Sequence, residues 1–199
     1  MTTIATMIPI VEEDAATGAV ADAYADYRTR FGRDHVPGIL KCFATHPPLL
    51  EQMLALASTL LFTDSHLSRK VKEMIATYIS ALNTCPYCLD SHASSLRTQG
   101  GSDELLQALS NANLEVPALS LKERRMLDFV GKVTIESHKI LPDDIDLMKG
   151  AGWDQQEIAE AVHIAALFAC FNRVANAFGL PSQHLLDLGP NLVHTRESA

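Results

Sequence analysis

The sequence has little positive charge and no long apolar run. Its 199 residues include 16 Lys and Arg against 24 Asp and Glu, which gives a net charge of −8 at pH 7. This balance argues against non-specific binding to nucleic acid or to an anionic membrane surface. The first residues lack a basic segment followed by an apolar one, and the uncharged stretch at residues 161–172 is too short to span a bilayer. We therefore expect a cytoplasmic protein that has neither nucleic acid nor a membrane as a partner.

Cysteine is also scarce, with four residues in the chain. In a reducing compartment so few thiols do not predict a structural disulfide framework, and a close pair is more typical of redox or metal chemistry. Apolar residues make up 47% of the sequence and charged residues 20%, which is typical of a globular protein. The length fits one domain of ordinary size, or two small fused repeats, and it is sufficient for a real hydrophobic core.

Strand signals are absent as well, because alternating β-branched residues and tight Asn-Gly or Asp-Gly turns do not occur. Apolar residues instead recur at helical spacing, so the sequence predicts an all-α fold. The predicted helices cover residues 13–31, 48–62, 68–82, 86–99, 103–111, 120–138, 143–149 and 154–178. Ser68, Ser120 and Asp154 are expected helix N-caps, and Gly179 is an expected stop. Residues 36–48 contain two proline sites and are expected to form an extended connection.

A weak internal repeat relates residues 67–74 to residues 119–126, which share Leu, Ser, Lys and Met in register. Two such units are expected to pack face to face, since neither buries its apolar face alone. Arg125 stands in the second unit where Glu73 stands in the first, so the second unit lacks the acid described below. The last helix, 154–178, is apolar nearly all round, which predicts a central position or a covering second subunit.

The chemistry is concentrated in the segment Cys85-Pro86-Tyr87-Cys88-Leu89-Asp90-Ser91-His92. Cys85, Cys88 and His92 share one face of a helix because they are spaced by three and four residues. Thiol redox chemistry needs a thiolate, a second sulfur to close a disulfide, and a group that moves the proton. The free N–H groups at the helix start are expected to lower the pKa of Cys85. His92 lies close enough to Cys88 to exchange a proton with it.

Glu73, twelve residues before Cys85, lies on the preceding predicted helix. The short connection at residues 82–85 makes the two helices antiparallel neighbours, so Glu73 and His92 are expected to meet. A carboxylate there orients the imidazole and raises its basicity.

Two other interpretations of the cysteine pair stay open. Cys85, Cys88 and His92 have zinc-ligand spacing, with Glu73 as a possible fourth ligand. The pair could also be plain core packing or a redox sensor that does not turn over, because free Cys is often buried. The remaining thiols, Cys42 and Cys170, lie in apolar settings and are expected to be inert core residues.

Glu73 followed by Cys85-x-x-Cys88-x-x-x-His92, on consecutive helices of an all-α chain, resembles the alkyl hydroperoxidase D (AhpD)/carboxymuconolactone decarboxylase superfamily. Residues 8–62 and 152–179 are similar to its longer, "peroxidase-related" subgroup. The resemblance implies an AhpD-like helical bundle that assembles into a homo-oligomer. It also implies one AhpD-like domain over residues 1–199, with residues 1–62 as an N-terminal helical extension packed on it.

The resemblance further implies an antioxidant thiol peroxidase that reduces organic hydroperoxides or hydrogen peroxide. In that family the cysteine pair becomes a disulfide, which an external dithiol reduces again, a lipoyl-type group or another; no bound cofactor and no metal is expected. Cys88 is assigned to attack on the peroxide and Cys85 to resolution, although the helix-start argument favours Cys85 as the thiolate. His92 and Glu73 form the proton relay.

Two further residues are expected to tune the site. The best-known peroxidase members carry His directly before the second cysteine, where this chain has Tyr87, a poor base near neutral pH. His163 lies in the apolar run of the last helix, either as a satisfied core histidine or as a wall of the thiol pocket. The decarboxylase branch needs no CxxC pair, so the intact pair makes that reaction less favoured.

Overall fold

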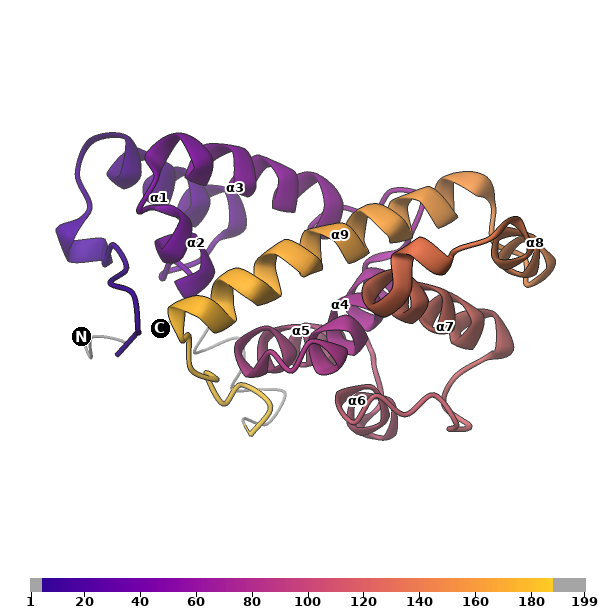
Figure 1. Cartoon of the computed structure of the whole chain (residues 1–199). Coiled ribbons are helices and arrows are strands. Elements are labelled where there is room, and N and C mark those ends of the chain that lie inside the picture. Colours follow the sequence, from indigo (N-terminus) through magenta and orange to yellow (C-terminus); the bar gives the residue numbers. More distant parts are fainter. Residues whose placement is uncertain (1–4, 188–199) are drawn as a thin grey trace.

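The computed structural model describes residues 5–187, and every regular element in this range is helical (Figure 1). The α-helices are α1 (Gly18–Phe31), α2 (Gly38–Phe43), α3 (Pro47–Leu61), α4 (Arg69–Leu82), α5 (Pro86–Thr98), α6 (Asp103–Ser110), α7 (Leu121–Glu136), α8 (Pro142–Gly150) and α9 (Gln155–Phe178). Two short 3₁₀ turns, η1 (Glu13–Ala15) and η2 (Ser137–Lys139), complete the set. The all-α prediction is confirmed.

Helix α9 is the axis of the fold. It crosses the molecule with α1, α2 and α3 along one side and α4, α5 and α7 along the other (Figure 1), and it contacts α2, α3, α4, α5, α7 and α8. Ala161, Ile164 and Phe168 on α9 are fully buried. The central position expected for this helix is therefore observed, although His163 and Cys170 mark a face that stays exposed.

By length and composition α9 has the properties of a membrane-spanning helix, with 24 residues and a mean hydropathy of 1.4 in its most apolar window. A core helix of a water-soluble protein can have the same length and hydropathy when most of it is buried. Here 56% of that window is buried inside the protein, which agrees with the packing role of α9.

The predicted helix starts are confirmed at the capping residues. Ser68 accepts a hydrogen bond from the backbone N–H of Val71 at the start of α4. Ser120 and Asp154 form capping boxes at the starts of α7 and α9. The two segments of the predicted repeat thus begin α4 and α7, and these two helices pack against each other.

Two predictions about the N-terminal third were wrong. The first helix begins at Gly18 rather than near residue 13, because Ala16 and Thr17 are extended and separate η1 from α1. The segment at residues 36–48 is not extended, since it contains α2. This six-residue helix is too short to show a helical period, yet Leu40, Cys42 and Phe43 on it are buried.

The turn between α4 and α5 positions the functional residues. Thr84 takes a left-handed conformation with a φ of 51°, and the backbone N–H of Cys85 donates to the carbonyl of Ser80 at 2.9 Å. The chain reverses within a few residues, and α4 and α5 pack closely along their length.

Candidate functional site

The two cysteines of the motif lie at the beginning of α5, in an apolar layer. Cys85 is the N-cap residue and Cys88 follows one turn later, with exposed fractions of 1% and 3%. Cys42, Tyr87, Ala175 and Leu180 complete the buried cluster around them. Both motif sulfurs are thus shielded from bulk water, and both are free thiols.

The two thiols ionise very differently. A hydrogen bond from the Cys88 thiol lowers the pKa of Cys85 to about 7, against the opposing effect of burial; the backbone N–H groups of Cys88 and Tyr87 act in the same downward direction. The same hydrogen bond, together with burial and the nearby Cys85 charge, raises the pKa of Cys88 well above its ordinary value. Cys85 is therefore the readily formed thiolate, as expected for a helix start, and Cys88 keeps the proton.

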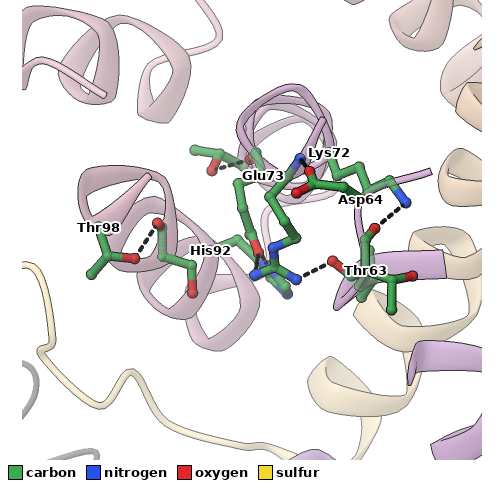
Figure 2. Close-up of polar contacts among 10 residues, drawn as sticks. Thr63, Asp64, Lys72, Glu73, His92 and Thr98 are labelled. Carbon is green, nitrogen blue, oxygen red and sulfur yellow. Dashed lines mark hydrogen bonds and ion pairs between the residues drawn. The ribbon is translucent and has the colours of Figure 1, made fainter. Parts of the chain in front are cut away.

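The predicted Glu–His pair is present. Glu73 on α4 and His92 on α5 point toward each other (Figure 2), and His92 Nδ1 lies 2.7 Å from Glu73 Oε2. The Glu73 side chain is 1% exposed and the His92 side chain 15%. The His92 and Phe168 rings also pack in a T-shaped arrangement, with 4.7 Å between centroids. This pairing fixes the ring and leaves Nε2 for proton transfer.

Arg69 is a member of this network that the sequence analysis did not single out. Its guanidinium pairs with Glu73 Oε1, so the two carboxylate oxygens of Glu73 serve Arg69 and His92 respectively. Arg69 also donates to the carbonyl of Leu61 and lies over the Phe62 ring, 5.1 Å from its centroid. The spacing of four residues between Arg69 and Glu73 on one helix was the signal that could have found it.

A cavity of about 700 Å³ opens beside the motif. Cys88, His92 and Tyr87 line it, whereas Cys85 lies behind them. Apolar walls come from α2, α3 and α9 and include Leu40, Leu54, Leu61 and Phe171. Another part of the lining is charged or polar and includes Glu12, Glu13, Arg33, His35 and Lys41. A molecule in this cavity therefore meets Cys88 before it meets Cys85.

Tyr87 and Asn172 hold the cysteine turn in place. The backbone N–H of Ile39 donates to the Tyr87 hydroxyl at 3.3 Å, and burial raises the pKa of Tyr87 far above its ordinary range. Tyr87 is thus a neutral structural link between α5 and α2. Asn172 of α9 is fully buried, donates to Ser80 Oγ at 3.1 Å and accepts from Asn83 at 2.9 Å.

Three other predicted positions are placed as follows. Cys42 is a buried thiol whose pKa burial raises to about 12, which agrees with an inert core residue. Cys170 is exposed, so its assignment to the core was wrong. His163 is exposed on α9 and does not line the cavity, because the helical register directs Ile164 and Ala161 inward instead.

Within residues 5–187 no three His, Cys, Asp or Glu side chains are grouped as metal ligands. Glu73, the proposed fourth zinc ligand, directs one carboxylate oxygen to Arg69 and the other to His92 Nδ1. Both of its oxygens are therefore engaged with these two side chains. The donor arrangement therefore gives the zinc interpretation no support.

Residues 47–130 match the carboxymuconolactone decarboxylase family. The fold is similar to an uncharacterized peroxidase-related protein from Ralstonia eutropha JMP134, described as an alkylhydroperoxidase AhpD core. The two share 25% identity and a TM-score of 0.83 over 96% of this chain and 98% of that chain. A second uncharacterized peroxidase-related protein, from Silicibacter sp. TM1040, shares 29% identity and a TM-score of 0.73 over 80% of this chain and 82% of that chain. The predicted AhpD-like bundle is confirmed by these likenesses.

An alkyl hydroperoxide reductase of Mycobacterium tuberculosis is 37% identical over 89 residues. This match covers 44% of the present chain but only 25% of that protein. The two proteins are therefore distant homologues that share one segment.

Proposed function

Because the chain belongs to the carboxymuconolactone decarboxylase/AhpD-like family, we propose that it is a thiol peroxidase that reduces organic hydroperoxides or hydrogen peroxide. The observation that carries this proposal is the meeting of three features at one place. A cysteine pair of unequal acidity, a His92–Glu73 pair at 2.7 Å and a cavity of about 700 Å³ converge at the first turns of α5.

The first step is assigned to Cys88, because it faces the cavity. His92 takes the Cys88 proton, directly or through a water, and Glu73 stabilises the imidazolium that forms. The Cys88 thiolate then attacks the terminal peroxide oxygen, the O–O bond breaks, and the alkoxide takes the proton to leave as an alcohol. Cys88 becomes a sulfenic acid.

The second step is assigned to Cys85, whose lowered pKa makes it a thiolate near pH 7. The Cys85 sulfur attacks the Cys88 sulfur, the S–S bond forms, and hydroxide leaves and is protonated to water. The two cysteines lose two electrons in total, and the hydroperoxide gains them to yield an alcohol and water. The hydrogen bond between Cys85 and Cys88 supports this order, because it places the resolving sulfur beside the sulfenic acid, where it can react before a second peroxide does.

A full cycle requires a reductant for the Cys85–Cys88 disulfide. We propose an external dithiol, of the lipoyl type or another, and no bound cofactor. The cytoplasm keeps such dithiols reduced, so the proposed location agrees with the proposed chemistry. We further propose a homo-oligomer, since a face of α9 with His163 and Cys170 stays exposed.

The test is peptide mapping by mass spectrometry on the fully reduced protein, before and after one equivalent of cumene hydroperoxide. We expect a rapid loss of two hydrogens localised to a Cys85–Cys88 bridge. His92→Ala should slow this loss by about 10²- to 10⁴-fold, the usual contribution of a positioned general base.

His163→Ala is the matched control, because it removes an imidazole that lies outside the cavity. It should leave the rate of bridge formation unchanged. If both thiols stay reduced in the native protein after exposure to peroxide, the peroxidase proposal is wrong. Repeated turnover with a dithiol, rather than a single oxidation, separates an enzyme from a redox sensor.

A further inference from the structure

The segment that follows α9, residues 181–187, is folded back onto α5, and we refer to it as the strap. Pro181, Ser182, Gln183 and Leu185 of the strap line the same cavity as Cys88 and His92. The strap thus supplies one wall of the space through which a substrate approaches the thiols.

One buried carboxylate holds the strap. Asp90, which is 5% exposed, lies on α5 between Cys88 and His92. Its Oδ2 accepts from the backbone N–H groups of Gln183 at 2.9 Å and Leu185 at 3.0 Å, and its Oδ1 accepts from Leu186 at 3.0 Å. Three backbone donors on one carboxylate are strong, charge-assisted bonds that define a single strap conformation.

The backbone of the strap is shaped for this anion. His184 has a φ of 56°, in the left-handed region that side chains other than glycine seldom adopt. A left-handed residue within a run of successive N–H groups makes a concave anion site, and here the donors on both sides of His184 converge on Asp90. Arg97 of α5 adds a bond to the Leu186 carbonyl at 3.1 Å.

We propose that Asp90 is a specificity-determining residue. Its carboxylate fixes the strap as a wall of the thiol cavity and so limits the size of the molecules that reach Cys88. The inference rests on the proposed function only in taking Cys88 as the thiol that meets the substrate. Asp90 and Cys88 lie within the same two turns of α5, so loosening of the strap at Asp90 changes a wall of the cavity that Cys88 also lines.

The test measures alkylation of Cys88 by a small reagent, iodoacetamide, and by a bulky one, N-(1-pyrenyl)maleimide. The full chain is used in a Cys85→Ser background, so that Cys88 is the thiol labelled in its peptide, and labelling is quantified by mass spectrometry. The ratio of the two rates cancels any change in the pKa of the thiol, since the same thiolate attacks both reagents. No peroxide turnover is needed, so failure here is distinct from failure of the peroxidase proposal.

Asp90→Ala should raise the ratio of bulky to small labelling by at least about tenfold, because the strap opens once its charged anchor is lost. Asp90→Asn keeps one acceptor oxygen and should give a ratio between those of the parent protein and Asp90→Ala. This variant also provides the test if Asp90→Ala folds poorly. Asp187→Asn is the matched control: it removes a strap carboxylate that pairs with exposed His184, and it should leave the ratio unchanged.

The free energy of unfolding, measured by urea denaturation, serves as the reference for general loosening. If, across the variants, the rise in the labelling ratio merely follows the loss of this free energy, Asp90 acts on overall stability and the proposal is overturned. An unchanged ratio in Asp90→Ala, or an equal rise in Asp187→Asn, overturns it as well.

Discussion

At the scale of the residue, Cys85 and Cys88 differ in acidity and in access to the cavity because their surroundings differ. Cys85 receives hydrogen bonds at the start of α5, while Cys88 donates one and faces the cavity. The sequence motif indicated both residues, together with His92 and Glu73. The spacing of the motif alone left open which sulfur faces the cavity, and only the family resemblance favoured Cys88, because much of the cavity wall comes from segments far away in the chain, among them α2, α3 and the strap.

The lowered pKa of Cys85 predicts a thiolate that forms near neutral pH. Absorbance at 240 nm, followed as the pH of the reduced protein is raised, should show one ionisation with a midpoint of about 7. The signal is small below this pH and grows above it, because the neutral thiol is the form that dominates in acid. Cys85→Ser should abolish this step, and Cys42→Ser should retain it, since the pKa of Cys42 is about 12. A step that survives in Cys85→Ser contradicts the assignment.

Arg69 is predicted to stabilise the buried carboxylate of the relay. Arg69→Gln leaves Glu73, whose side chain is 1% exposed, without its guanidinium partner. We expect a loss of about 3 kcal/mol in the free energy of unfolding, measured by urea denaturation. Arg124→Gln is the control, because its partner Glu115 is 81% exposed and such a surface pair contributes less than about 1 kcal/mol. Equal losses in the two variants argue against a special role for Arg69.

At the scale of the element, the sequence predicted the helices that carry their own start and stop signals. Ser68, Ser120 and Asp154 cap helices where expected, since capping is a local interaction between a side chain and the next turn. Helix α2 was missed because its six residues are held by burial against other elements rather than by a local pattern. The anchoring of the strap was equally hidden, because Asp90 and its donors are separated by 93 to 96 residues.

The composition of α9 could not predict which of its faces is exposed. The helix is apolar nearly all round, yet His163 and Cys170 are exposed while Ala161 and Phe168 are fully buried. Apolarity alone does not define which side of a helix faces the core when alanine occurs on both sides. Only the packing partners decide the register, and these are set by the rest of the fold.

At the scale of the whole molecule, one buried ion pair joins the axis of the fold to the helix that carries the relay acid. Lys72 of α4 is completely buried, and its Nζ lies 2.8 Å from Glu160 Oε1 of α9. The same ammonium donates to the Thr63 carbonyl at 2.8 Å and to Ser65 Oγ at 2.7 Å, as the bond to Thr63 in Figure 2 illustrates. The Lys72 ammonium thus joins α4, the segment at residues 63–65 and α9. Lys72 precedes Glu73 directly in the sequence.

Removal of this charge should destabilise the entire fold. Lys72→Met leaves the Glu160 carboxylate buried without its cation, and we expect a loss of about 3–5 kcal/mol in the free energy of unfolding. In the double variant Lys72→Met/Glu160→Gln no uncompensated charge remains, so its loss should be smaller than the sum of the two single losses. Urea denaturation of the four proteins measures this coupling. Strictly additive losses contradict a direct interaction between the two side chains.

The unequal acidity of the cysteine pair has an electrochemical consequence for the protein. Closing the disulfide releases two protons per two electrons when both thiols are protonated, but only one when Cys85 is already a thiolate. The midpoint potential therefore falls by about 59 mV per pH unit in acid and by about 30 mV per pH unit above neutrality. The slope of the midpoint potential against pH changes at the pKa of Cys85, about 7. Near neutral pH the tendency of this pair to give up electrons thus becomes less dependent on acidity.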